Sequence, residues 1–596
     1  MNQNIITRYQ TLATQAGQQA DEFRKLANFY SLSRLGVFGL MIFAVTLTIS
    51  FDNFYIAGIG IVLLLLVFAW LVARQGVYER ERDYYLNLQK VTLNELADDN
   101  LYNNGQQFNN DKHFYTSDLD IFGPASLFQL INRAATATGN NKLAGWLKAP
   151  ASRKVILQRQ QATTEVDTEW KLQLQALLLF ANTEAPTRLP NLFRFLQMPL
   201  NLPGEKALEK YAKIAPYLLA AGIVAAVFMP VLKVIPVLMG LIHLGIVFSK
   251  AAYIRKTDVV ADKIGKVLNS YADVFRKIET YDWKAEYTAA LAQKLKDDKT
   301  SEKIKELAEL INKLNYHLNM IVGVVLNAFF LWDIKQITAI ENWKRSNSKN
   351  IEEAFDVIAE FEALISIAVP TLNYTDWTVP VIAETEGYTL TATNIAHPLI
   401  RNGNRVANDY ELNDALHIDI ITGSNMAGKS TFLRTIGINA VLALAGAKVC
   451  ASAMQVSVVT IVSYMRIKDN LNESTSTFKA ELDRLQMLLA AVENEERVFF
   501  LIDEMLRGTN SVDKYLGSKA VIEQLIAKKG VGMVATHDLQ IARLEDKYPA
   551  YVRNYYFDIQ IINGEMLFDY KLKYGECKTF NASLLLKQIG IEFTED

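Results

Sequence analysis

Two uncharged apolar runs close to the start of the chain restrict the folds open to it. Leu35–Phe51 carries no charged side chain, and Phe54–Ala73 forms a second such run after Asp52 and Asn53. A transmembrane helix needs about 20 predominantly apolar residues, with a range of about 17 to 25. A helix in a soluble core usually keeps a polar face, and these two runs have none. The sequence therefore predicts a helical hairpin in a membrane rather than one buried in a soluble core.

Basic side chains flank the outer ends of this hairpin, and the short loop between the runs carries none. They are Arg24, Lys25 and Arg34 before the hairpin and Arg74, Arg80 and Arg82 after it. Lys and Arg remain mainly on the cytoplasmic side of a membrane. We therefore expect both ends of the hairpin in the cytoplasm, the loop near Asp52 outside, and a multi-pass protein of the cytoplasmic (inner) membrane.

A second apolar region leaves two interpretations open. Ala215–Leu232 and Val234–Ser249 are apolar runs separated by Lys233, and prolines and His243 interrupt or flank them. The pattern favours a second hairpin with the same orientation, and a hydrophobic helix pair in a soluble core is the alternative. Met320–Trp332 is also apolar but is too short to span a bilayer, so we expect a buried core helix there.

Composition excludes several classes of protein. The net charge is -2 and the pI is near 6.4, which excludes a polycation that binds nucleic acid by charge alone. Half of the residues are hydrophobic and 21% are charged, which excludes general disorder. The only two cysteines in the sequence, Cys450 and Cys577, cannot form a disulfide framework. We expect a reducing compartment and no structural metal.

The last third of the chain carries a phosphate-binding loop. Ile418–Thr422 is predicted to be a short strand, residues 423–430 follow as G-x-x-x-x-G-K-S, and a helix is predicted from about Thr431. Such a loop points backbone N–H groups at phosphate oxygens, and the helix N-terminus adds partial positive charge. Lys429 is expected to reach the β- and γ-phosphates of ATP, and Ser430 to bind Mg²⁺. The predicted nucleotide-binding residues are Gly423, Ser424, Asn425, Met426, Ala427, Gly428, Lys429, Ser430 and Thr431.

A second predicted strand ends in two acidic residues. Residues 498–502 are apolar, and Asp503 and Glu504 follow them. Asp503 is predicted to hold Mg²⁺ together with Ser430, and Glu504 is predicted to polarise the attacking water as a general base. His537 ends a further strand, where ATPases of the ABC type place a histidine that senses the γ-phosphate. Ser476 begins a helix, either as an N-cap or as a ligand for a phosphate supplied by another subunit.

These segments together resemble the MutS family of DNA mismatch-repair ATPases. The resemblance rests on residues 423–434, 476–478, 503–509 and 535–537, and upstream on residues 397–398, 406–409 and 127–133. It covers roughly Asp118 to Ile591. It implies an ATPase that uses ATP and Mg²⁺, a homodimer in which Ser476 of one chain faces the nucleotide of the other, and an adenine-side contact from Asn408.

The sequence also departs from the family pattern. Ala427 and Leu506 stand where glycines are usual, although neither change removes a catalytic group. We expect the N-terminal mismatch-reading domain to be absent, with the first hairpin in its place. The second hairpin falls where the family has the lever and clamp helices that encircle DNA, and no Smr-type nuclease domain is expected. Mismatch recognition in the usual manner is therefore not predicted.

The predicted architecture is an α/β P-loop ATPase domain with a largely parallel sheet, joined to an all-α region with two transmembrane hairpins. We expect an N-terminal helix and hairpin over residues 1–98, a linker over 99–117, a MutS-like helical core with the second hairpin over 118–377, and the ATPase domain over 378–596. The predicted function is that of a membrane-anchored, dimeric ATPase acting on DNA or a DNA-associated process. Two alternatives remain: an ATP-driven membrane machine, or a regulatory ATPase with a protein partner, and neither alternative involves DNA.

Overall fold

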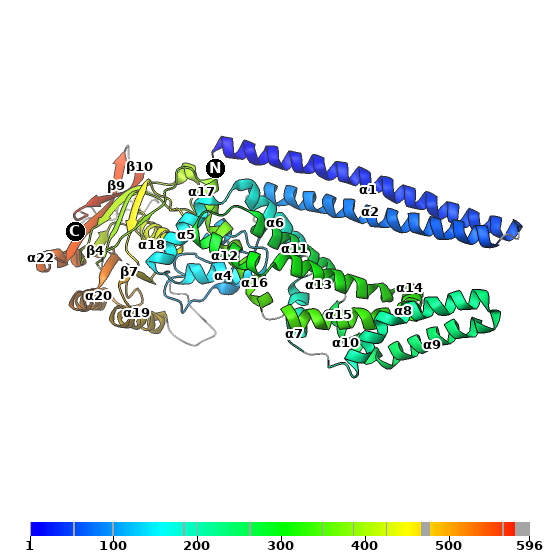
Figure 1. The fold of residues 1–596 in the computed structure, drawn as a ribbon. Coiled ribbons are helices and arrows are strands. Elements are labelled where there is room, and N and C mark those ends of the chain that lie inside the picture. Colours follow the sequence, from blue (N-terminus) through cyan, green and yellow to red (C-terminus); the bar gives the residue numbers. More distant parts are fainter. Residues whose placement is uncertain are drawn as a thin grey trace.

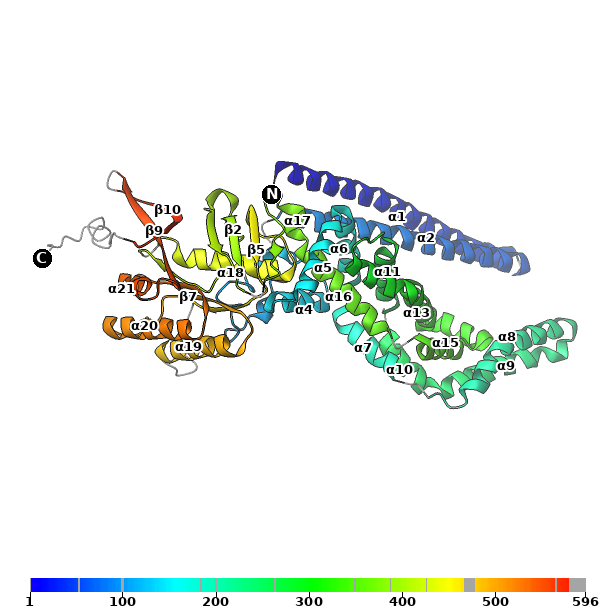
Figure 2. The ribbon, with the colours of Figure 1, turned by 60° about the vertical axis from the view of Figure 1, so that its left-hand side comes forward.

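The protein consists of an α/β domain at one end, a helical core in the middle and two helical arms at the other end (Figure 1). The computed structural model describes residues 2–51, 54–97, 101–182, 185–198, 201–261, 264–347, 350–385, 387–424, 426–465, 477–562 and 565–577. Both arms leave the core on the side away from the α/β domain, as Figures 1 and 2 agree.

The first arm is a pair of antiparallel helices, α1 (Gln3–Phe51) and α2 (Phe54–Asn94). They pack along their length, where Tyr30 stacks on Tyr78 and Phe23 on Tyr85, with ring centroids 5.2 and 5.5 Å apart. The predicted hairpin is thus confirmed as two helices, and its turn at Asp52 and Asn53 lies outside the described residues.

The second arm contains α8 (Glu205–Phe228), a short 3-10 turn η2 (Pro230–Lys233) and α9 (Val234–Ser249). The predicted break between the two apolar runs is therefore present. Pro230 stands at the start of the turn, where its missing N–H and fixed φ interrupt α8. The two helices pack against each other and against α14 (Met320–Phe330).

The prediction of a buried core helix at Met320–Trp332 is wrong. Met320 is 81% exposed and Ile321 76% exposed, and only Gly323 and Asn327 of α14 are buried. The apolar pattern identified a helix, but it did not indicate which neighbours would cover it. The helix lies beside the second arm, so its outer face is left uncovered in the described structure.

Within the described residues, four helical stretches are long and apolar enough to cross a membrane, judged by length and composition alone. They are Gln3–Thr46, Gly60–Asn94, Glu205–Phe228 and Val231–Ser249. The pair Met320–Phe330 and Trp332–Asn347 passes the same test together, but it is bent by 79°. Most apolar side chains of both arms are exposed.

The helical core joins the arms to the α/β domain. Amphipathic helices form it: α11, for example, buries Val267, Tyr271, Val274 and Ile278 at spacings of three and four residues. Its elements are η1 (Gln106–Phe108), α3 (Leu127–Ile131), α4 (Ala137–Lys148), α5 (Arg153–Glu165), α6 (Thr168–Asn182), α7 (Ala185–Gln197), α10 (Ala251–Ala261), α11 (Ile264–Thr280), α12 (Glu286–Asp297), α13 (Thr300–Leu314), η3 (Asn315–Leu318), α15 (Trp332–Asn347), α16 (Ile351–Ile367) and α17 (Val369–Asn373).

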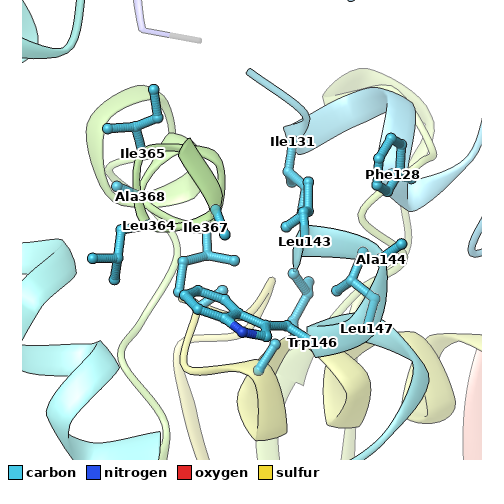
Figure 3. Packing of buried hydrophobic residues seen from close by; sticks show 14 of the residues in the cluster. Phe128, Ile131, Leu143, Ala144, Trp146, Leu147, Leu364, Ile365, Ile367 and Ala368 are labelled. Carbon is cyan, nitrogen blue, oxygen red and sulfur yellow. The ribbon is translucent and has the colours of Figure 1, made fainter. Parts of the chain in front are cut away.

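The apolar interior of the core runs into that of the α/β domain. Figure 3 shows Leu143 and Trp146 of α4 on the side that faces Ile367 of α16, and all three belong to one buried apolar cluster. Residues 99–117, predicted to be a linker, contribute Tyr115 to the same interior, and Leu119, Ile121 and Phe122 follow in the predicted core. Tyr102 of the predicted linker is buried as well.

A buried cluster of charged and polar side chains fastens the first arm to the core. The carboxylate of Glu95, just after α2, accepts hydrogen bonds from Arg133 at 2.8 and 2.9 Å and from Lys171 at 2.8 Å. Asn373 donates to the same carboxylate at 2.9 Å and accepts from the Tyr9 hydroxyl at 2.7 Å. Residues from α1, α6, α17 and the segment after α3 therefore meet at the end of α2.

The α/β domain contains two sheets. The six-stranded sheet has the order β10-β9-β4-β8-β7-β6, in which only the β9–β10 pair is antiparallel, so the predicted largely parallel sheet is confirmed. The four-stranded sheet has the order β1-β5-β2-β3. Figure 2 shows α18 on one face of the larger sheet and α19 and α20 on the other.

The bounds of these elements are close to those expected at the P-loop. β4 is Ile418–Thr422, as predicted, and α18 begins at Lys429, slightly before the expected Thr431. The domain's elements are β1 (Val381–Ile382), β2 (Leu390–Ile395), η5 (Asn402–Asn404), β3 (Asn408–Leu412), β4, α18 (Lys429–Ala445), β5 (Ala453–Val456), β6 (Thr460–Tyr464), α19 (Thr477–Asn494), β7 (Val498–Asp503), α20 (Ser511–Ala527), β8 (Val531–Ala535), α21 (Leu539–Ala542), α22 (Leu544–Lys547), β9 (Val552–Ile562) and β10 (Glu565–Tyr574).

Candidate active site

A cavity of about 770 Å³ opens at the carboxyl ends of β4, β7 and β8. These strands are neighbours and run parallel, so the residues that follow them meet at one edge of the sheet. Ligand sites in open α/β sheets form at this edge. The sequence-predicted residues that line the cavity are Asn408, Met426, Ala427, Gly428, Lys429, Ser430, Thr431, Asp503, Glu504 and His537.

The loop between β4 and α18 has the curled backbone that a phosphate cradle needs. Gly423 and Gly428 have φ of 145° and 108°, a region that favours glycine. A Cβ on Gly423 would lie 2.7 Å from the carbonyl oxygen of Phe557, so this position also needs the missing side chain. Met426 has a positive φ of 70°, whereas Ala427 does not, which explains why alanine is tolerated there.

Lys429 lies buried at the N-terminus of α18. Its ammonium group donates to the carbonyl oxygens of Gly423 and Ser424 at 2.7 and 2.8 Å. Burial lowers the pKa of Lys429, and the nearby carboxylates of Asp503 and Glu504 oppose that shift. The lysine is thus a cation held inside the loop by two carbonyls that phosphate oxygens can replace.

Glu504 is held by a histidine and two cationic side chains. His537 Nε2 and Lys514 Nζ both contact its Oε1, the latter at 2.6 Å, and Arg507 Nε lies 3.2 Å from its Oε2. Burial disfavours the charged form of this carboxyl, but the hydrogen bonds from His537 and Lys514 outweigh burial and lower its pKa to about 2. Glu504 is therefore an ionised carboxylate at neutral pH and has the charge that a general base requires.

The backbone after β7 is strained at two positions. Glu504 and Leu506 have φ of 54° and 55°, which side-chain-bearing residues rarely adopt. The Leu506 side chain is buried and packs where Gly517 of α20 leaves room for it. Leu506 thus adopts a backbone conformation typical of glycine, at a position where the MutS-like motif usually has glycine. Its packing beside Gly517 helps to stabilise this conformation.

Asp503 and Ser430 are the oxygen ligands that the site offers to a metal ion. Asp503 ends β7 and is 7% exposed, and Arg507 Nη2 lies 3.5 Å from its Oδ2. Mg²⁺ binds oxygen ligands and usually takes only one or two from the protein, with phosphate and water supplying the rest. One carboxylate and one hydroxyl beside a phosphate cradle fit this ion.

His537 lies beside Glu504, and its side chain is partly exposed. Its Nε2 contacts Glu504, and its Nδ1 is buried without a hydrogen-bond partner among the described residues. The ring therefore connects the general-base candidate to the loop after β8. A change in position of His537 would change the surroundings of Glu504 directly.

Asn408, predicted to contact the adenine side of the nucleotide, lines the cavity and also has partners within the protein. Its Nδ2 donates to the Tyr570 carbonyl at 3.0 Å, and its Oδ1 accepts from the Leu572 N–H at 2.8 Å. The side-chain amide thus fixes β10 beside the cavity, and both of its ends are engaged in this structure. Tyr570 itself lines the cavity.

Four further residues line the cavity, and three of them had no signal in the sequence. They are His397, Arg405, Phe557 and Tyr570. Burial, reinforced by the positive charge of Arg434, lowers the pKa of His397 to about 4, so its imidazole is neutral at pH 7. Only His397 lies in a segment singled out from the sequence.

Two predicted residues fall outside the described part of the chain. Asn425 of the P-loop and Ser476 before α19 are not described, so their roles remain predictions. Gly423 and Ser424 belong to the same loop and contact Lys429, although they do not line the cavity themselves.

Comparison with known proteins relates this domain to a family. Residues 419–584 match the family model for MutS domain V. The DNA mismatch repair protein MutS of Aquifex pyrophilus is 29% identical over 343 residues, which cover 54% of this chain and 36% of that protein. The proteins of the same name from Ehrlichia chaffeensis and Methanosarcina acetivorans are each 32% identical, over 216 and 239 residues. These matches cover 35% and 39% of this chain and 26% of each relative.

The chain thus spans between about a quarter and little more than a third of the length of these relatives. The family match extends from β4 to beyond β10 and includes the P-loop, Asp503, Glu504 and His537, but not Asn408. The C-terminal segment of the chain is therefore a MutS-type ATPase domain, distantly related to the DNA mismatch repair proteins.

Proposed function

We propose that this protein is a membrane-anchored ATPase of the MutS type, which binds ATP with Mg²⁺ and hydrolyses it to ADP and phosphate. The observation that carries the proposal is the convergence of Lys429, Asp503, Glu504 and His537 on one cavity behind a phosphate-binding loop. Lys429 begins α18 after the loop that follows β4, Asp503 and Glu504 stand at the end of β7, and His537 follows β8. Lys429 supplies a cation, Asp503 a metal ligand and Glu504 a base, and His537 contacts this base.

The chain's own residues have distinct tasks in this proposal. The backbone of the P-loop and Lys429 bind the phosphates and orient them at the N-terminus of α18. Mg²⁺, when bound, neutralises charge on the phosphate oxygens. Glu504 accepts the proton of the attacking water, and His537 holds the carboxylate in place through their contact. Asn408 fixes β10 along the side of the cavity.

We further propose that both arms insert in the cytoplasmic membrane. Their apolar side chains are exposed, and both arms leave the core on the side opposite the ATPase domain (Figure 1). A single bilayer could therefore receive both arms while the core and the ATPase domain remain in the cytoplasm. Exposed apolar faces of this extent indicate an interaction with lipid or protein.

Cysteine labelling in intact cells tests this topology. In a chain with Cys450 and Cys577 replaced, Asn53→Cys and Val231→Cys should react with a membrane-impermeant reagent from outside. Gln10→Cys, on the exposed surface of α1, is the matched control and should react only after permeabilisation. The reason is the cytoplasmic preference of the flanking Arg and Lys residues. Recovery of the wild-type chain in the soluble fraction without detergent would exclude the anchor.

We also propose that the active sites form across a homodimer. Ser476 precedes α19 by one residue, and in the resembled family this element reaches the nucleotide of the partner. A hydroxyl and a helix N-terminus supplied in trans would make hydrolysis depend on association. Confinement of the arms to one membrane would raise the local concentration of protomers and favour this association.

Mixing two inactive variants tests the shared site. Lys429→Ala removes a phosphate contact, Ser476→Ala removes the trans hydroxyl, and each variant alone should hydrolyse ATP poorly. If the site is shared, a mixed dimer regains one complete site, so the mixture should recover up to a quarter or so of the wild-type rate. If mixed dimers form and no activity returns, the hydroxyl acts within its own chain and the shared-site arrangement is wrong.

We propose DNA, or a DNA-associated complex, as the object of the ATPase, by a mode other than the usual mismatch recognition. The support is the name of the relatives, DNA mismatch repair protein MutS. Binding of the detergent-solubilised dimer to duplex DNA should weaken as salt is raised, because phosphate contacts release counterions. If no DNA binds at low salt, the ATPase acts instead on the membrane arms or on a protein partner.

A further inference from the structure

The helix α14 has a surface that the helical core does not use. It is 11 residues long and contains no charged residue. Ile321, Val325 and Phe329 are 76%, 50% and 42% exposed, although they are apolar. At 1.5 Å per residue the helix is about 16 Å long, roughly half of the 30 Å hydrocarbon core of a bilayer.

This helix is fixed to the second arm by a buried histidine. His243 of α9 is fully buried, and its Nδ1 lies 2.8 Å from the carbonyl oxygen of Ala328 in α14. A carbonyl can only accept, so Nδ1 carries the hydrogen and Nε2 accepts from the Tyr211 hydroxyl of α8, 3.0 Å away. Gly240 of α9 lies next to Ala328, since a Cβ built on Gly240 would lie 3.8 Å from the Ala328 Cβ, at ordinary contact distance.

The chain enters and leaves this excursion at one place. The indole N–H of Trp332, just after α14, donates to the carbonyl of Lys313 at 2.7 Å, and the Trp332 ring stacks on Tyr316. The segment between Lys313 and Trp332 therefore leaves the helical core and returns to it at the same place, as a re-entrant segment would. Trp and Tyr are enriched where a membrane protein crosses the lipid–water interface.

The turn that ends α14 is closed by internal hydrogen bonds. Leu331 has a φ of 48°, and α15 departs at 79°. Asn327 donates to the Asp333 carboxylate and accepts from the Asp333 N–H, both at 2.9 Å, and His317 lies 3.3 Å from the same carboxylate. Non-helical backbone next to a membrane-inserted helix needs its polar groups satisfied, and these hydrogen bonds do so at the turn.

We propose that α14 inserts in the cytoplasmic leaflet as a re-entrant helix, so that α8, α9 and α14 form one three-helix membrane unit whose outer surface contacts acyl chains. Met320 lies at the deep end, and Phe330 and Trp332 lie at the interface. This inference rests on the proposed membrane anchor and adds a third inserted element to it. We infer that lipid covers the exposed face of α14, because this face is uncharged and continues the exposed face of α9. The face also ends at the stacked aromatic pair Tyr316 and Trp332.

Depth measurements on single-cysteine variants test this inference. The full-length chain, with Cys450 and Cys577 replaced, carries a fluorescent label at Val325→Cys in α14 or Leu241→Cys in α9, and is reconstituted in phosphatidylcholine–phosphatidylglycerol vesicles. Lys305→Cys, on the exposed surface of α13, is the matched aqueous control. Nitroxide lipids should quench the α14 label as strongly as the α9 label, and a soluble quencher should reach only the control.

The outcomes separate the two proposals. If nitroxide lipids quench the α9 label but not the α14 label, the second arm inserts and the re-entrant helix is excluded. The re-entrant helix is also excluded if neither quencher reaches the α14 label, because protein then covers α14. If the soluble quencher reaches both labels, the membrane anchor itself fails. Within α14, a label at Ile321→Cys should be quenched more by deep nitroxides than one at Phe330→Cys, and the reverse order would overturn the proposed orientation.

Discussion

Replacement of Glu504 by glutamine is expected to leave ATP binding intact and to lower kcat by about 100- to 10,000-fold, the usual contribution of a positioned general base. Glutamine keeps the size of the side chain and can still hydrogen-bond His537 and Lys514, but it cannot accept a proton from water. Lys429 and the P-loop, which bind the phosphates, are not changed. Steady-state hydrolysis and equilibrium nucleotide binding of the purified protein measure the two effects separately.

Lys514→Met is the matched control for this experiment. It removes the 2.6 Å contact to Glu504 but retains the carboxylate, so hydrolysis should persist at pH 7. Loss of the positive charge should raise the pKa of Glu504 from about 2 toward its ordinary value. Since a base works only when it is deprotonated, the acid limb of kcat/KM should move to higher pH. A wild-type kcat in Glu504→Gln would show that another group activates the water.

Glu95→Ala is expected to reduce the free energy of unfolding by about 3–5 kcal/mol, the usual cost of removing one partner from a buried ion pair. The change leaves Arg133 and Lys171 as buried cations without a counter-charge, and it also removes an acceptor from Asn373. Chemical or thermal unfolding of the detergent-solubilised protein measures the loss. Glu384→Ala is the control, because Glu384 pairs with Arg153 at 2.7 Å on the surface and should contribute about 1 kcal/mol or less.

The pH dependence of the Glu95 effect has a definite sign. Burial opposes ionisation of this carboxyl, but the charges of Arg133 and Lys171 outweigh burial and hold its pKa well below its usual range. A lowered pKa in the folded state contributes stability that is complete above the unfolded value, near 4.3, and is lost as the pH falls further. The difference between wild type and Glu95→Ala should therefore be constant near pH 7 and shrink in strong acid. Equal stability of the two proteins at pH 7 would contradict the assigned role of the cluster.

The strands and the loop that form the site could be predicted from the sequence, because each depends on residues that are neighbours in the chain. A short apolar strand, a glycine-rich loop and Lys429 stand together in the chain, and the same holds for the strand that ends in Asp503 and Glu504. Neighbouring parallel strands then bring the two segments to one edge. His537 follows from the same rule.

The partners of these residues were not accessible, because they depend on how separate elements pack. Lys514 reaches Glu504 only because α20 turns back toward the end of β7. The Asn408 amide is engaged by β10, which lies over 150 residues further along the chain. An apolar run likewise identified α14, but the run could not show that the second arm, and not the core, lies beside this helix. The role of Glu95 had no signal in the sequence, since its partners Arg133, Lys171 and Asn373 come from three other parts of the chain.

The continuity of α2 couples its two ends mechanically. The helix has 41 residues, so it is about 60 Å long, and it extends from the apolar run to the residue before Glu95. No proline interrupts it, so the end in the first arm and the end at the core cannot change direction independently. A rotation of about 10° at the core would move the far end sideways by about 10 Å for a rod of this length. A small rotation of α2 at the core therefore produces a large displacement at the far end of the first arm.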